Sequence, residues 1–186
     1  MYKDESLKKY LDDLAARLPA PGGGSAAAMT AAMGAALISM VANFTVGKPK
    51  YAQHEQEIKG ILEKSEKLRA EFTELVDRDV EAYKSKDVRK ALDVPCALAR
   101  LCHVAIQLCP PLITKGNVNL VSDVAVAAVF LEAAFAAASC NVEINLKMLG
   151  DEKLTKELRS ELELKGKLIS KIRVETEAGV GKIIRG

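Results

Sequence analysis

The most constraining feature of the chain is a long stretch without charge that begins with three consecutive glycines. From Pro19 to Tyr51 the sequence reads PAPGGGSAAAMTAAMGAALISMVANFTVGKPKY, and no charged residue occurs before Lys48. We expect a helix over most of it, with Ser25 as the N-cap and the last turn near Val46. A helix that is uncharged on every side must be buried, either in a membrane or among other helices.

Two observations favour a helical bundle over a membrane span. Ala, Gly, Ser, Thr and Asn fill much of the stretch, and they contribute little to membrane insertion compared with Leu or Ile. A second Ala-rich run, from Val124 to Cys140, is interrupted by Glu132. Because small side chains let helices approach closely, we expect the two runs to pack together inside a bundle, and we predict no membrane partner.

The rest of the chain also shows helical periodicity and no strand pattern of useful length. We predict further helices over residues 7–18, 53–83, 95–109, 122–149 and 154–172. Pro95 is expected to begin one of them, Ser122 or Asp123 to cap the next, and Gly150 with Asp151 to separate the last two. The prediction is a single all-α domain spanning residues 1–186, a bundle of long antiparallel helices. Its uncharged helices would leave apolar surface exposed on a monomer, which predicts a homodimer.

Composition excludes several functional classes. A net charge of +2, from 27 basic and 25 acidic residues, lacks the basic excess typical of nucleic-acid binding. The cysteines at 96, 102, 109 and 140 form no C-x-x-C pair and only two histidines occur, which argues against a metal site. We expect buried, reduced thiols. The first residues lack a signal-peptide pattern, and we predict a cytoplasmic protein.

Several polar residues occupy positions where an apolar residue is expected. Asp79 falls on the heptad seam of the predicted helix 53–83, whereas Asp77 and Glu81 fall off it and should be solvated. Asp79 is either solvated because the seam has left the core, or half-buried with a raised pKa suited to acid–base chemistry. Asn141 and Asn145 share one helix face and either pair between helices or face a ligand.

The glycine loop has two interpretations. Gly22, Gly23 and Gly24 with Ser25 precede a helix start, where free N–H groups and the helix dipole favour an anionic group. The alternative is a tight turn into a buried helix, because the loop lacks the Lys of a P-loop and the strand of a dinucleotide fingerprint.

Three stretches in order resemble the cyclodeaminase/cyclohydrolase family of folate enzymes, the family of the C-terminal half of formiminotransferase-cyclodeaminase and of free-standing methenyltetrahydrofolate cyclohydrolases. They are PAPGGGSAAA with MVANFTVGKPKY, then DRDVEAY, then GNVNLVSDVAVAA with NVEINL. The resemblance covers residues 19 to 146. The link between Tyr83 and Pro95 is shorter than the family pattern leads us to expect, which affects the local geometry after Asp79.

The resemblance implies an all-helical homodimer that acts on one-carbon derivatives of tetrahydrofolate without a further cofactor. It favours a cyclohydrolase, which converts 5,10-methenyltetrahydrofolate and water to 10-formyltetrahydrofolate. The first alternative is a cyclodeaminase, which closes 5-formiminotetrahydrofolate to the methenyl form with loss of ammonia. The second is a non-catalytic helical dimer that binds folate or a partner protein.

The resemblance also suggests roles for the polar residues. Asp123 is the first candidate for proton transfer or for stabilising the amidinium, and Asp79 is the second. The amides are expected to orient the pterin and the bridge, the glycine loop to hold a carboxylate or part of the pterin, and the lysines to meet the glutamate tail. The pterin and tail ends remain interchangeable at this stage. The predicted binding residues are Gly22, Gly23, Gly24, Ser25, Lys48, Lys50, Asn117, Asn119, Ser122, Asn141 and Asn145.

Overall fold

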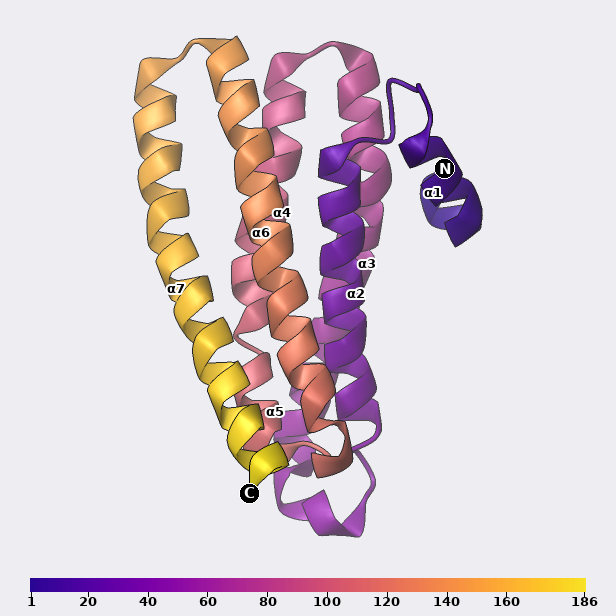
Figure 1. The fold of residues 1–186 in the computed structure, drawn as a ribbon, viewed down its shortest axis with the longest axis vertical. Helices are drawn as coiled ribbons and strands as arrows, with labels where there is room; N and C mark the ends of the chain where they lie inside the picture. Colours follow the sequence, from indigo (N-terminus) through magenta and orange to yellow (C-terminus); the bar gives the residue numbers. More distant parts are fainter.

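The computed structural model describes residues 1–186 and is built of helices without β-strands (Figure 1). The prediction of an all-α fold is confirmed. The α-helices are α1 (Leu7–Ala15), α2 (Gly23–Asn43), α3 (Glu55–Ser85), α4 (Val88–Ile106), α5 (Cys109–Lys115), α6 (Val121–Leu149) and α7 (Glu152–Arg185). Short 3-10 turns are η1 (Tyr2–Asp4), η2 (Pro49–His54) and η3 (Val118–Leu120).

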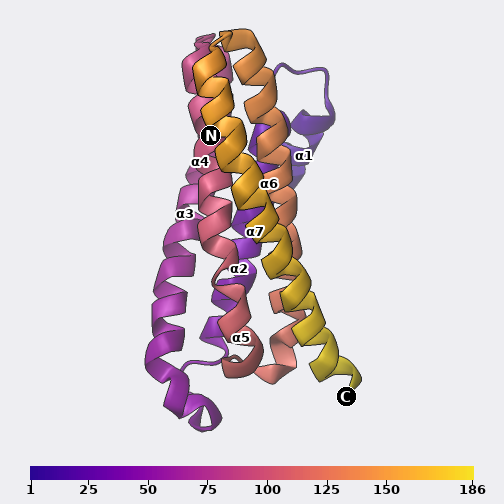
Figure 2. The same cartoon turned by 90° about the vertical axis from the view of Figure 1, so that its left-hand side faces the viewer.

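The long helices α2, α3, α4, α6 and α7 run along the same axis in alternating directions (Figures 1 and 2). Helix α2 packs against α3 and α6, α4 packs against α6 and α3, and α7 covers α6 and α4. The alternation sorts the helix ends. The start of α2, the end of α3, the start of α4 and the end of α6 meet at one end of the bundle, which we call the upper end. The remaining ends of these helices meet at the lower end.

The two Ala-rich helices α2 and α6 pack against each other, as the sequence predicts. Ala28, Ala31 and Ala35 of α2 are fully buried. A Cβ added to Gly34 would lie 3.0 Å from Cγ of Leu131 in α6, so a larger residue at Gly34 would push the helices apart. Small side chains therefore set the spacing in the middle of the core.

The starts of α2 and α6 differ from the sequence prediction. Helix α2 begins at Gly23 with Gly22 as its N-cap, and Ser25 lies inside the first turn with its hydroxyl buried. Helix α6 begins at Val121, so neither Ser122 nor Asp123 caps it. The break at Gly150 and Asp151 is confirmed, with Gly150 in the left-handed region at φ 72° and Asp151 capping α7.

Pro95 lies inside α4 instead of beginning it. The side chain of Asp87 accepts hydrogen bonds from the backbone N–H groups of Arg89 and Lys90, so the helix starts well before the proline. This side-chain cap satisfies N–H groups that a helix start otherwise leaves unpaired. Helix α4 therefore begins at Val88, and the prediction that Pro95 begins it is wrong.

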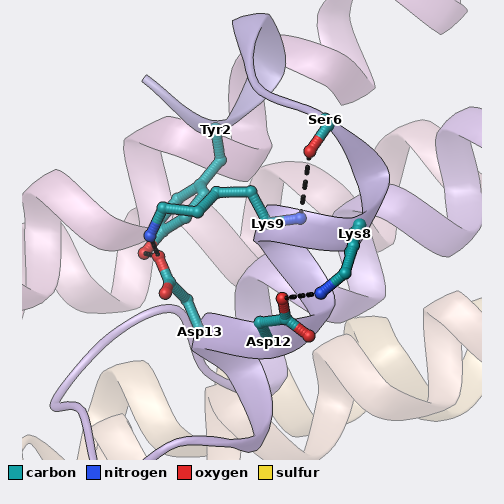
Figure 3. A network of polar contacts seen from close by, with 6 residues as sticks. All are labelled: Tyr2, Ser6, Lys8, Lys9, Asp12 and Asp13. Carbon is teal, nitrogen blue, oxygen red and sulfur yellow. Dashed lines mark hydrogen bonds and ion pairs between the residues drawn. The ribbon is translucent and has the colours of Figure 1, made fainter.

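The N-terminal segment folds back onto α3 and buries an acid that the sequence predicts to be solvated. Asp77 is only 4% exposed, and its carboxylate accepts hydrogen bonds from the backbone N–H groups of Tyr2, at 2.6 Å, and Lys3, at 3.2 Å. The side chain of Asp13 joins Tyr2 and Lys9 on the outer side of this segment (Figure 3). The prediction for Asp77 is wrong because its partners are more than 70 residues away in sequence.

Three segments are long and apolar enough to cross a membrane by length and composition alone, namely Gly23–Asn43, Val88–Lys115 and Val118–Leu149. In the bundle 61% of the most apolar part of the first is buried, against 44% and 39% for the other two.

Cys96, Cys102 and Cys109 are buried as expected, whereas Cys140 is exposed on α6. No group of three or more His, Cys, Asp or Glu side chains is arranged to hold a metal ion.

Candidate active site

The upper end of the bundle contains a cleft of about 840 Å³ between α2, α3, α4 and α6. It brings together residues from the predicted glycine loop, the predicted acidic stretch and the predicted asparagine pair. Its walls are formed by Pro19, Ala20, Gly22, Gly23, Gly24, Asp79, Ala82, Tyr83, Lys84, Lys86, Asp87, Val88, Ala91, Asn141, Ile144, Asn145 and Met148.

Asp79 of α3 lies against the first turn of α2. Its Oδ2 accepts a hydrogen bond of 2.9 Å from the backbone N–H of Ser25. A Cβ added to Gly24 would lie 2.1 Å from Oδ1 of Asp79, so the absence of a side chain at Gly24 makes room for the carboxylate. The first turn of α2 thus faces a carboxyl group of the chain itself, that of Asp79, and the binding of a ligand anion by the glycine loop stays a prediction.

Burial raises the pKa of the Asp79 carboxyl, and the Ser25 N–H opposes this to a smaller extent. No charged side chain forms a salt bridge with Asp79. Desolvation disfavours the charged form of an acid, so the group binds a proton more readily than a solvated aspartate does. The half-buried alternative for Asp79 is therefore confirmed.

The two asparagines of α6 reach the same cleft. Asn145 donates from Nδ2 to the backbone carbonyl of Ala91 in α4, at 2.8 Å, and so links two walls of the cleft. Asn141 donates from Nδ2 to the carbonyl of Ala137 in its own helix, at 2.9 Å. Neither amide oxygen accepts a hydrogen bond within the chain, which leaves two neutral acceptors at the edge of the cleft.

The other predicted site residues lie at the lower end of the bundle, along α6 from the cleft. They are Lys48, Lys50, Asn117, Asn119, Ser122 and Asp123. Asp123 stands 18 positions before Asn141 in one uninterrupted helix, a separation of about 27 Å at 1.5 Å per residue. Within one chain Asp123 therefore does not meet Asp79 or the glycine loop.

Asn117 stabilises the lower end of the bundle through three hydrogen bonds. Its Nδ2 donates to the carbonyl of Phe44, its Oδ1 accepts from the N–H of Asn119, and its own N–H donates to Oγ1 of Thr45. Val118 adds a hydrogen bond from its N–H to the hydroxyl of Tyr51. These contacts fasten the end of α2 to the turn before α6.

Comparison with known proteins places the chain in a family. The model of the formiminotransferase-cyclodeaminase family matches residues 6–86 and 84–164. The chain belongs to this family.

Relatives within the family carry two names. The chain is 40% identical to a methenyltetrahydrofolate cyclohydrolase of Methylorubrum extorquens, over 88% of this chain and 89% of that protein. It is 32% identical to the formimidoyltransferase-cyclodeaminase of Rattus norvegicus, over 80% of this chain and 32% of that longer protein. The crystal structure of a formiminotetrahydrofolate cyclodeaminase from Thermotoga maritima superposes with a TM-score of 0.93 at 32% identity, over 99% of this chain and 100% of that one.

Three residues at the end of α3 line the cleft and were not among the predicted site residues. Tyr83, the last residue of the acidic stretch, lines the cleft together with Lys84 and Lys86, and its side chain is 59% exposed. Lys86 ends α3 in the left-handed region, at φ 58°. Their signal in the sequence is KSKD, where two lysines follow an aromatic residue at a helix end.

Proposed function

We propose that the protein is a methenyltetrahydrofolate cyclohydrolase, which converts 5,10-methenyltetrahydrofolate and water to 10-formyltetrahydrofolate. The observation that carries the proposal is the half-buried Asp79, held at a glycine-led helix start in a cleft of suitable size. The relative in Methylorubrum extorquens, which carries this name and matches over nearly its whole length, supports it.

The chemistry of the cleft suits a folate. The amides of Asn141 and Asn145 offer acceptors to the N–H groups of a pterin, and the exposed ring of Tyr83 offers a surface for stacking. Lys84 and Lys86 supply positive charge for the carboxylates of the glutamate tail. We therefore propose these two lysines for the tail in place of Lys48 and Lys50, which lie at the other end of the bundle.

Asp79 would act first as a base. The bridge carbon of the methenyl substrate is cationic, and a carboxylate beside it stabilises that charge. Asp79 takes one proton from the attacking water as the oxygen–carbon bond forms, which gives a neutral tetrahedral carbon.

The same group then acts as an acid. Asp79 returns a proton to N5 as the bond between the bridge carbon and N5 breaks, and the remaining hydroxyl proton leaves to solvent. The cation and water thus yield a neutral formyl product and one proton. A carboxyl group whose pKa is raised by burial is suited to both steps.

The test is the loss of the characteristic absorbance of methenyltetrahydrofolate on addition of the purified protein. The expected result is a rate well above buffer hydrolysis, with 10-formyltetrahydrofolate as the product. A protein that binds the substrate without accelerating its hydrolysis would instead be the non-catalytic folate binder, and one that neither binds nor hydrolyses it would contradict the proposal outright.

A cyclodeaminase is the second candidate, supported by the similarity to the Thermotoga maritima cyclodeaminase over the whole chain. N10 would then add to the formimino carbon with transfer of its proton to the formimino nitrogen, and Asp79 would protonate the resulting amino group, which leaves as ammonia. The appearance of methenyl absorbance from 5-formiminotetrahydrofolate, with release of ammonia, would identify this activity. The comparison of the two initial rates decides between the candidates.

We also propose a homodimer that forms through the face shared by α2 and α6, which lie side by side on the near side of Figure 1. Exposed apolar residues follow α6 at helical spacing and continue on α2. They are Met33, Phe44, Val126, Val129, Ile144 and Met148. Helix α2 carries no charge, so a second copy of this face is a suitable partner. Val129→Glu is expected to leave a 20.0 kDa species in sedimentation, whereas a wild-type protein of that mass at micromolar concentration would contradict the dimer.

The dimer bears on Asp123. A two-fold axis perpendicular to α6 would bring the lower end of a second copy near the cleft, and only such an arrangement would let Asp123 act there.

We further propose that the enzyme works in the cytoplasm, because four unpaired cysteines suit a reducing compartment. It needs no cofactor, because water is the only co-reactant.

A further inference from the structure

Tyr10 is the only buried residue of α1, and its hydroxyl reaches the first turn of α2. Its side chain is 3% exposed, and the phenol oxygen lies 3.2 Å from Oγ of Ser25. The ring of Tyr2 packs edge-on against it, with centroids 5.5 Å apart. A polar atom this deeply buried requires a partner, and Ser25 is the one it has.

Ser25 connects this hydroxyl to the cleft. The residue is fully buried, and while its side chain faces Tyr10, its backbone N–H donates to Asp79 at 2.9 Å. The three residues therefore form one chain of contacts, from α1 through the start of α2 to the carboxylate at the end of α3.

We propose that Tyr10 is a positioning residue for Asp79. Its hydroxyl fixes the Ser25 side chain, and thereby holds the first turn of α2 where the Ser25 N–H orients the carboxylate. This inference rests on the proposed function insofar as Asp79 is the proton-transferring group. It assigns to α1, outside the cleft, a part in the reaction.

The electrostatics of the pair agree with this role. Burial raises the pKa of the Tyr10 phenol, the hydrogen bond with Ser25 lowers it, and the nearby charge of Asp79 raises it further. The phenol therefore stays protonated at neutral pH. The neutral phenol can share a hydrogen bond with the Ser25 hydroxyl without placing a second negative charge beside Asp79.

Tyr10→Phe removes the hydroxyl and keeps the ring, and Tyr2→Phe is its matched control. The hydroxyl of Tyr2 donates to Asp13 at 2.9 Å (Figure 3) and makes no hydrogen bond with Ser25. Loss of one hydrogen bond corresponds to about a 3- to 10-fold effect. We expect Tyr10→Phe to lower kcat by that factor with KM within about 2-fold, and Tyr2→Phe to leave both unchanged.

A double-mutant cycle tests the route through Ser25. Because Tyr10→Phe and Ser25→Ala break the same contact, the double variant should be no slower than Ser25→Ala alone. Additive losses would overturn the proposal, as would a Tyr10→Phe enzyme with wild-type kcat or one that differs only in KM.

Amide hydrogen exchange gives a readout that does not depend on activity. The exchange rate of the Ser25 N–H should rise about 3- to 10-fold in Tyr10→Phe and stay unchanged in Tyr2→Phe. Equal rates in Tyr10→Phe and the wild type would overturn the positioning role even if the protein hydrolyses its substrate. A wild-type protein inactive on folates, with the exchange effect present, would instead refute the proposed function and leave the contact chain intact.

Discussion

Gly24→Ala should damage catalysis far more than stability, because the added methyl group occupies the place of the Asp79 carboxylate. The new Cβ would lie 2.1 Å from Oδ1, 2.7 Å from Cγ and 3.0 Å from Oδ2 of Asp79. Restoring an ordinary contact of 3.4 Å to Oδ1 requires a displacement of about 1.3 Å, the difference between 3.4 Å and 2.1 Å. The obstacle is the end of a side chain, so the carboxylate moves and the helices stay in place.

The magnitude follows from that displacement. A misplacement of about 1 Å in a reacting group costs on the order of 10²-fold in rate. The hydrogen bond from the Ser25 N–H to the carboxylate contributes about 1.5–3 kcal/mol, and replacing glycine by alanine in a helix returns about 0.5–1 kcal/mol. The free energy of unfolding should therefore fall by only about 0.5–2.5 kcal/mol.

The assay combines the hydrolysis rate, followed by methenyl absorbance, with thermal unfolding. Gly60→Ala is the matched control, because a Cβ there meets no atom within 4 Å and the position lies within α3, far from the cleft. It should keep the wild-type rate and raise stability by up to about 1 kcal/mol. A Gly24→Ala enzyme that retains a third or more of the wild-type rate would show that the position of the Asp79 carboxylate does not limit catalysis.

Three further predictions concern stability. Asp77→Ala should free the N–H groups of Tyr2 and Lys3 and cost about 1–3 kcal/mol, with faster amide exchange in the first residues as the check; unchanged exchange would contradict it. Leu131→Ala should cost about 2–5 kcal/mol in denaturant unfolding, because the side chain is fully buried against α2, and a loss below 1 kcal/mol would show that the helices close the gap. Because the native pKa of Asp79 is raised above 3.8, the unfolded chain loses this proton at lower pH than the native protein does, and wild-type stability falls as pH rises between the two pKa values. The free energy of unfolding of Asp79→Asn minus that of the wild type should therefore increase from pH 3 to pH 8 in thermal unfolding. A constant or decreasing value of this quantity would contradict the sign.

The packing of the core could be predicted from the sequence, because a helix that is uncharged on every side must be buried against other helices. Helices α2 and α6 can place small, uncharged faces against each other, and they do. The start of α4 was missed because Pro95 is a strong local signal, whereas the cap at Asp87 looked like part of a polar linker. The burial of Asp77 could not be read from local periodicity, because its partners belong to a segment that returns from the start of the chain.

The sequence predicted the glycines, Asp79 and the two asparagines of the candidate site, but it also placed Asp123 there. The prediction did not consider at which end of the bundle each helix begins and ends. In an antiparallel bundle the start of one helix shares an end with the finish of the next. Gly22–Ser25 begin α2, Asp79 stands near the end of α3 and Asn141 near the end of α6, so they meet. Asp123 begins α6 and therefore lies at the other end. Counting the helices would have separated these two acids from sequence alone.

The most direct test of the account compares Asp79→Asn with Asp123→Asn in single-turnover hydrolysis of methenyltetrahydrofolate. Asparagine keeps the shape of each side chain and removes its capacity to take a proton. We predict that Asp79→Asn loses about 10²–10⁴-fold in rate while still binding the substrate. A wild-type rate in Asp79→Asn, with the rate lost in Asp123→Asn instead, would contradict it.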